Sequence, residues 1–300
     1  MGLLEELQME IERRTLSGGG WASGNALTAG IETTCYGLMA LRHDQEPARG
    51  KAIAVLSRTQ HPDGSWPAFE GDDPEGCWTT ALALIALIFV SVSRTHLDDS
   101  FGRLLNSRGR EGQWPWNWKF RTVDRHVQFD PDKYGWPWFS GTVSWVVPTA
   151  FALLALKQAG CCRTELALRR IRLGTEMLLD RACPNGGWNA GNGIVFSAGL
   201  SAHMDTTAIA LLALTDDEEP IVRRALNWLR EACARCSSGY SLAWTTLTLL
   251  LRDRPAAELS LARLCEVLPG KLTTLSTDTL SLAVIAIRAS EGGRNPFKVT

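Results

Sequence analysis

This sequence has almost no net charge and no long apolar run. Its 300 residues include 31 Lys and Arg against 32 Asp and Glu, which leaves a formal net charge of −1. Without a basic field to attract phosphates, we expect no nucleic-acid partner. The longest apolar run, residues 81–92, is shorter than the ~20 residues that a membrane-spanning helix needs. It indicates a buried helix instead.

The signals of export and of a zinc site are also missing. Residues 1–14 are amphipathic and mixed in charge, without the basic start and apolar stretch of a signal peptide. The Cys-x-x-Cys pair of Cys233 and Cys236 has no second pair with which to complete a zinc site. We therefore predict a reduced, cytoplasmic chain with no metal and no cofactor.

Tyr is scarce, but Trp is abundant. The chain has 3 Tyr and 12 Trp. Such a composition is typical either of a packed aromatic core or of a cavity lined by aromatic faces. Composition alone leaves both interpretations open.

Internal repetition of one apolar segment is the strongest pattern. Each copy is apolar nearly all round and rich in Ala and Leu, as in a helix buried on every side. The six copies are residues 34–41, 80–87, 149–156, 207–214, 246–251 and 280–287. Gly/Trp-rich loops precede most copies, at residues 18–21, 62–66, 112–114 and 184–188. Amphipathic stretches come before them, including residues 49–60, 165–181, 218–234 and 256–268.

The repeating unit is thus an outer helix, a Gly/Trp loop and an inner helix. Six such units predict an all-α protein, an α/α toroid of helix hairpins closed into an α6-α6 barrel. A closed ring is favoured over an open solenoid because the inner helices have almost no polar face. We expect a single domain over residues 1–300, with a Trp-rich insertion at about 113–145. The insertion is either a lid that supplies aromatic faces or a structural plug.

The segment Gln60-His-Pro-Asp-Gly-Ser-Trp66 resembles the QW repeats of squalene and oxidosqualene cyclases. The Thr-Thr-Ala starts of the inner helices are similar to theirs as well. The resemblance covers essentially the whole chain and implies a toroid around a central apolar cavity that takes an isoprenoid substrate. Protein prenyltransferase β subunits share this toroid, so the resemblance is more specific for the fold than for the activity.

Alignment of the repeats gives one column of positions, which the resemblance places at one mouth of the cavity. The column comprises Glu32, Trp78, Val147, Asp205, Trp244 and Asp278. The segment His203-Met-Asp-Thr-Thr-Ala208 resembles the acid motif of class II terpene cyclases. The resemblance implies that Asp205 is the general acid and that His203 stands where a supporting Asp would be. For Asp205, Glu32 and Asp278 a plain helix-capping role is the alternative.

Protonation of an alkene creates a cation, which needs aromatic faces worth roughly 0.5–2 kcal/mol each. We therefore predict that the aromatic and acidic residues near the mouth bind the substrate. These are Trp78, Trp136, Trp138, Trp145, Trp244, Asp278 and Glu32.

The resemblance leaves two other functions open. Because the usual neighbours of the acid are missing, a non-catalytic toroid that binds an isoprenoid or a peptide is one alternative. A prenyltransferase β-like subunit is disfavoured, since Thr207 stands where that family has a zinc-binding Cys. The larger cyclases of the family place their site between two toroids. We therefore expect either a second subunit or a smaller substrate, and peripheral contact with a membrane is compatible with both.

Overall fold

The computed structural model describes residues 2–24, 26–42, 45–72, 75–124, 128–158, 160 and 164–299. The predicted insertion at 113–145 includes residues 125–127, which lie outside this description. No helix of the described residues combines the length and the apolar character needed to cross a bilayer.

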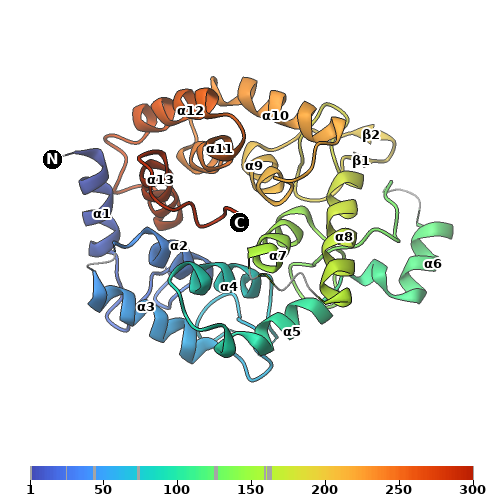
Figure 1. Cartoon of the computed structure of the whole chain (residues 1–300), viewed down its shortest axis with the longest axis horizontal. Coiled ribbons are helices and arrows are strands. Elements are labelled where there is room, and N and C mark those ends of the chain that lie inside the picture. Colours follow the sequence, from blue (N-terminus) through green and yellow to red (C-terminus); the bar gives the residue numbers. More distant parts are fainter. Residues whose placement is uncertain are drawn as a thin grey trace.

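Within these residues, inner helices form a closed ring (Figure 1). They are α2 (Ile31–Ala40), α4 (Thr79–Phe89), α7 (Val146–Gln158), α9 (Met204–Ala213), α11 (Gly239–Arg252) and α13 (Thr277–Ser290). Each contacts the next in chain order, and α13 returns to contact α2. The predicted α/α toroid is therefore confirmed.

A second set of helices surrounds this ring (Figure 1). They are α1 (Leu3–Arg13), α3 (Glu46–Thr59), α5 (Asp98–Asn106), α8 (Glu165–Asp180), α10 (Pro220–Cys233) and α12 (Arg254–Val267). Every outer helix except α1 packs against the inner helix that precedes it in the chain. Helix α1 packs against α13. The inner helices are buried along most of their length, as their lack of a polar face predicts.

Tryptophans in four of the loops join the two layers. The indole Nε1 of each donates a hydrogen bond to a carbonyl in the last turns of the preceding outer helix, at 2.6–2.8 Å. Its backbone N–H donates to a Thr hydroxyl of the following inner helix, at 2.9–3.3 Å. The pairs are Trp21 with Thr34, Trp66 with Thr80, Trp136 with Thr149 and Trp188 with Thr207. We call these four residues the staple tryptophans.

The third repeat differs from its prediction. The sequence pattern assigned its Gly/Trp loop to residues 112–114, but the structure gives the staple position to Trp136. Trp114 instead opens helix α6 (Trp114–Thr122) and is 81% exposed. The insertion causes the difference, because it places 32 residues between Trp136 and its acceptor Leu104, against 10 residues in the other three repeats.

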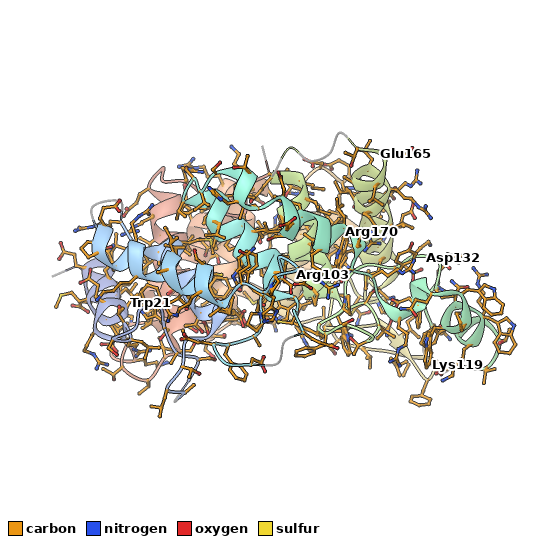
Figure 2. All side chains as sticks on the ribbon, turned by 90° about the horizontal axis from the view of Figure 1, so that it is seen from below. Trp21, Arg103, Lys119, Asp132, Glu165 and Arg170 are labelled. Carbon is orange, nitrogen blue, oxygen red and sulfur yellow. The ribbon has the colours of Figure 1, made fainter. Side chains whose placement is uncertain are left out.

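The insertion protrudes from the ring beside α8 (Figures 1 and 2). It contains α6, and η2 (Arg110–Gly112) leads into it. The carboxylate of Glu111 accepts a hydrogen bond from the Ser144 N–H at 3.1 Å and pairs with Arg181 at 3.3 Å. Both charged side chains are at most 1% exposed. Part of the insertion is thus fixed to the ring by a buried ion pair.

A segment after α13 fills one end of the ring. Phe297 is fully buried, with its ring centroid 4.7 Å from that of Trp244. Asn295 donates to the Leu247 carbonyl at 3.1 Å, and Gln158 donates to the Pro296 carbonyl at 2.6 Å. In Figure 1 this end of the chain lies inside the ring. The remaining short elements are η1 (Arg94–His96), β1 (Ile194–Val195) and β2 (Ala198–Gly199).

Candidate functional site

The starts of four inner helices bring ionisable side chains to one mouth of the ring. Glu32, Asp205, Tyr240 and Asp278 are each the second residue of their helix. Burial, and then the negative charges of Glu32, Asp205 and Asp278, raise the pKa of Tyr240 above its usual value. All three carboxyl groups are therefore close enough to the Tyr240 hydroxyl to influence its ionisation. We call these four residues the acid mouth.

Tyr240 is a member that the sequence alignment missed. The predicted column placed Trp244 at this level, but α11 begins at Gly239, so Trp244 lies one turn deeper. The Ser238 hydroxyl caps the helix by accepting from the Ser241 N–H at 3.2 Å. Alignment on Thr246 had shifted the fifth repeat by four residues. The polar first turn, with a Ser before Gly239, is the signal that locates the true start.

Glu32 and Asp278 form a pair of like groups. Burial and the negative charge of Asp278 raise the pKa of Glu32 to about 8, although the Tyr36 hydroxyl opposes part of this shift. Burial also raises the pKa of Asp278, against a hydrogen bond from Thr33. The usual pKa of a Glu carboxyl is near 4.5. Because the pKa of Glu32 is instead about 8, its protonated form is favoured at neutral pH.

Neither member of this pair caps its helix. Ser276 caps α13 by accepting from the Thr279 N–H at 3.2 Å, and Gly30 occupies the cap position of α2. The Oδ1 atom of Asp278 is buried without a hydrogen-bond partner in the described part of the chain. Capping therefore does not explain why these acids lie here.

Asp205 and His203 are more open. His203 occupies the cap position of α9 without a side-chain capping bond, and its backbone N–H donates to the Trp188 carbonyl at 2.8 Å. The His203 side chain is exposed, whereas Asp205 is partly buried. Among the described residues, the Asp205 carboxylate has neither a hydrogen bond nor an ion pair, with His203 or with any other side chain. Capping does not occupy Asp205 either.

A row of aromatic rings leads from the mouth into the ring of inner helices. Trp138 packs edge-on against Trp78 with centroids 5.0 Å apart, and Trp78 lies 5.6 Å from Phe151. Phe151 is 5.8 Å from Trp244, which in turn contacts Tyr36 at 5.9 Å and Phe297 at 4.7 Å. We call these six residues the aromatic row.

Sequence analysis found three members of this row, Trp78, Trp138 and Trp244, but missed the other three. Tyr36 and Phe151 occupy the third position of their repeat copies, and after the four-residue correction Trp244 occupies it too. That shared position is a signal that a corrected alignment reveals. Phe297 has no such signal, because it lies beyond the last repeat.

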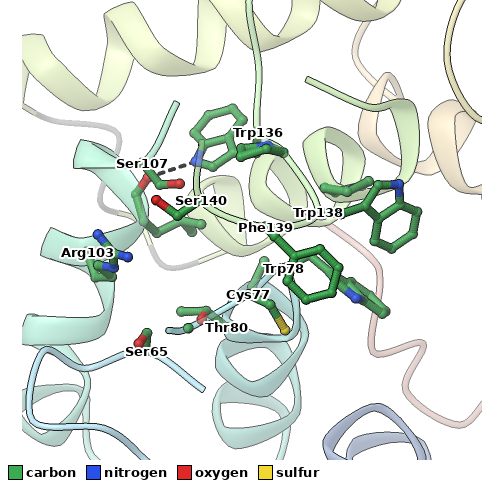
Figure 3. A pocket seen from close by; sticks show the side chains of 15 residues that line it. Ser65, Cys77, Trp78, Thr80, Arg103, Ser107, Trp136, Trp138, Phe139 and Ser140 are labelled. Atoms are coloured by element: carbon green, nitrogen blue, oxygen red, sulfur yellow. Dashed lines mark hydrogen bonds between the residues drawn. The ribbon is translucent and has the colours of Figure 1, made fainter. Parts of the chain in front are cut away.

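Trp136 and Trp145 lie elsewhere. Trp136 is a staple tryptophan, 3% exposed, and its bond to Leu104 is drawn in Figure 3. The cavity between Trp136, Trp78 and Trp138 measures about 30 Å³ (Figure 3), room for little more than one water molecule. The ring of Trp145 lies against Gly191, in the loop before α9. The structure thus gives Trp136 a structural role and keeps Trp145 out of the aromatic row.

A closed ring of inner helices is also the fold of solved type II terpene cyclases. A product complex of the type II terpene cyclase MstE from Scytonema superposes with a TM-score of 0.61 at 15% identity, covering 96% of this chain and 98% of that one. A complex of an MstE variant with geranylgeranyl dihydroxybenzoate gives 0.56 at 17% identity over 92% and 80%. This chain therefore has the squalene cyclase-like fold.

One curated protein matches in sequence. Lanosterol synthase erg7A from Aspergillus fumigatus is 30% identical over 146 residues, which are 47% of this chain and 17% of that protein. The chain thus matches about a sixth of the length of that relative. No protein-family model matches the chain.

Other enzymes share the fold. A Clostridium perfringens α-amylase superposes with a TM-score of 0.66 at 10% identity, covering 95% of this chain and 97% of that one. The likeness defines the architecture, so the chemistry has to be argued from the acid mouth.

Proposed function

We propose that this protein is a terpene-cyclase-like enzyme that protonates and cyclises an isoprenoid. The observation that carries the proposal is Glu32, an acid whose pKa is raised to about 8 beside Asp278 and beside Tyr36 of the aromatic row. Protonation of an alkene needs a carboxylic acid whose pKa has been raised by its surroundings. The MstE complex with geranylgeranyl dihydroxybenzoate supports a small-molecule isoprenoid as the substrate class.

Two residues are candidates for the proton donor. The resemblance of residues 203–208 to the cyclase motif assigns the step to Asp205, with His203 as its support. The buried environment favours Glu32, whose proton is retained at neutral pH. After transfer, the Tyr36 hydroxyl favours the charged form of Glu32. Both acids belong to the acid mouth, so they compete for the same substrate end.

The cation would be stabilised by aromatic faces. Trp78, Phe151 and Trp244 follow one another at centroid distances of 5.6 and 5.8 Å. Each face offers a cation roughly 0.5–2 kcal/mol, more when water is excluded. We infer that substrate carbons lie along this row, to which the insertion contributes Trp138.

A non-catalytic toroid that binds an isoprenoid or a peptide is the second candidate. The observation in its favour is that Phe297 fills the axis, with no exposed surface, against Trp244. A substrate as long as the row has to displace residues 293–299 or stop before them. A smaller substrate, or a site shared with a second subunit, fits this limit.

The exposed side chains of helix α6 support contact with a membrane surface. Trp114 and Trp118 are 81% and 56% exposed, and Lys119 and Arg121 follow them on the same helix. Exposed Trp beside cationic side chains is typical of membrane interfaces. We propose that the protruding α6, visible in Figure 2, makes peripheral contact with the source of the apolar substrate.

The test is incubation of the purified protein with polyprenyl substrates of several lengths, with products detected by mass spectrometry. We expect Glu32→Gln to lose product formation by at least a hundredfold, because the amide cannot donate an acidic proton. Equal product from Asp205→Asn and wild type would remove Asp205 as the donor. Glu231→Gln, an exposed change on α10, is the matched control. Binding without any product from the wild type would favour the non-catalytic toroid.

A further inference from the structure

A groove on the outer wall of the ring is lined by three arginines. It lies where α5 and α8 contact each other, beside the chain that leads to Trp136. Its volume is about 290 Å³. The lining residues are Leu105, Asn106, Arg108, Tyr134, Leu166, Arg169 and Arg170. We call it the arginine groove, and none of its residues belongs to the acid mouth or the aromatic row.

Arg170 forms the base of the groove. It is 4% exposed, and its Nη2 donates to the Ser107 carbonyl at 2.8 Å and to the Gly135 carbonyl at 3.2 Å. The guanidinium lies 4.1 Å from the Trp136 ring and 5.2 Å from the Tyr134 ring. Its Nε and Nη1 atoms are buried without a hydrogen-bond partner among the described residues. The side chain is therefore held rigidly, with donor capacity to spare.

The charge of Arg170 is not balanced by a carboxylate. Burial and, to a smaller extent, the positive charges of Arg108 and Arg169 lower the pKa of Arg170 to about 10, and Tyr134 opposes part of this shift. In the described part of the chain, none of these three arginines forms an ion pair. Arg181, the other buried arginine of this region, pairs with Glu111 at 3.3 Å. Buried charges normally have such a partner.

We propose that the arginine groove binds an oxyanion of the phosphate class. Arg108 and Arg169 are exposed at its rim and can turn toward a ligand, whereas Arg170 supplies a fixed positive charge beneath it. Guanidinium groups match phosphate oxygens with paired hydrogen bonds, and the Tyr134 hydroxyl adds a further donor. An anion here offsets three like charges that otherwise repel one another. The site is independent of the acid mouth, so it stands whether or not the protein is an enzyme.

The ligand phosphate can be free or part of a lipid headgroup, and the experiment separates the two. Calorimetry with inorganic phosphate and with pyrophosphate, at ionic strength held constant with chloride, tests the free anion. Sedimentation with phosphatidylcholine vesicles, with and without phosphatidic acid, tests the headgroup. Binding in either arm supports the proposal and identifies the source.

The matched variants decide whether the groove is the site. We expect Arg108→Gln with Arg169→Gln to weaken binding at least tenfold. Arg224→Gln with Arg235→Gln removes the same charge from exposed positions away from the groove and should bind as wild type does. Equal affinity in both double variants would overturn the assignment. The proposal also fails if no probe shows saturable binding to the wild type. Circular dichroism establishes that each variant is folded, and product formation at the acid mouth should be unchanged in both.

Discussion

Glu111 and Glu32 both place a carboxyl group in the wall of the ring, but they differ in what faces them. Glu111 meets Arg181 at 3.3 Å and a backbone N–H, and both members of the pair are buried. Glu32 faces a second acid, Asp278, and burial raises the pKa of both. An opposite charge makes a buried acid part of the framework. Burial beside a second acid instead favours the protonated form, which is the form that an acid catalyst needs.

The largest expected effect concerns the framework pair. Arg181→Met leaves Glu111 buried without its counter-ion and should lower the free energy of unfolding by about 3–5 kcal/mol. Urea denaturation followed by circular dichroism measures it. Adding Glu111→Gln to the same variant should restore part of the loss. A double variant as unstable as the single one would mean that packing, and not charge, explains the effect.

The pair of Glu32 and Asp278 should make the free energy of unfolding fall as the pH rises. The pKa of Glu32 is raised from 4.5 to about 8 in the folded state, so between these values the folded state holds one proton more than the unfolded state. Stability from this group is present below the unfolded pKa and is lost as pH rises toward 8, by up to about 1.4 kcal/mol per pH unit. Glu32→Gln should flatten this slope and be more stable than wild type at pH 8. A parallel pH profile in wild type and variant would contradict the pairing.

A smaller effect is expected in the loops that join the two layers. Thr207→Val keeps the shape of the side chain but removes the acceptor of the Trp188 N–H, which is bonded at 2.9 Å. Leaving a buried N–H without a partner costs about 1–3 kcal/mol. The adjacent Thr206→Val is the control, since Thr206 is also a buried residue but its hydroxyl forms no hydrogen bond in the described structure. Thermal unfolding of the two variants gives the comparison, and equal midpoints would contradict it.

The smallest effect should be that of Asp205→Asn. Its carboxylate is partly exposed and has no hydrogen bond or ion pair within the described residues. Such a substitution normally changes stability by less than about 0.5 kcal/mol. Chemical denaturation at pH 7 measures it. A loss comparable to that of Arg181→Met would show that Asp205 belongs to the framework.

The ring could be predicted from the sequence because every inner helix repeats the same apolar copy. A helix that is apolar all round has to be buried by neighbours on every side. The acids Glu32, Asp205 and Asp278 were found as members of one column for the same reason. Their pairing could not be, because the distance between α2 and α13 depends on closure of the ring and not on any spacing along the chain.

The misassigned positions have local causes. In the fifth repeat, Thr246 resembled the helix-start Thr of other copies, which hid the polar turn at Gly239 and with it Tyr240. In the third repeat, Trp114 stood at the expected place while the insertion had moved the equivalent residue to Trp136. Phe297 reaches Trp244 from a segment without repetition. A contact made only through the tertiary fold leaves no pattern to find.

The packing of α1 against α13 has a consequence for folding. Each other outer helix joins the inner helix just before it, so those contacts are local and can form as the chain lengthens. The seam between α1 and α13 joins distant parts of the chain, since Arg14, at the end of α1, bonds to the carbonyls of Leu272 and Leu275, which are 258 and 261 residues away. Contacts of such sequence separation form late, since a long loop must close first. Until then the facing apolar flanks of α2 and α13 have no neighbour, and the growing chain should depend on chaperones to keep these flanks from aggregating.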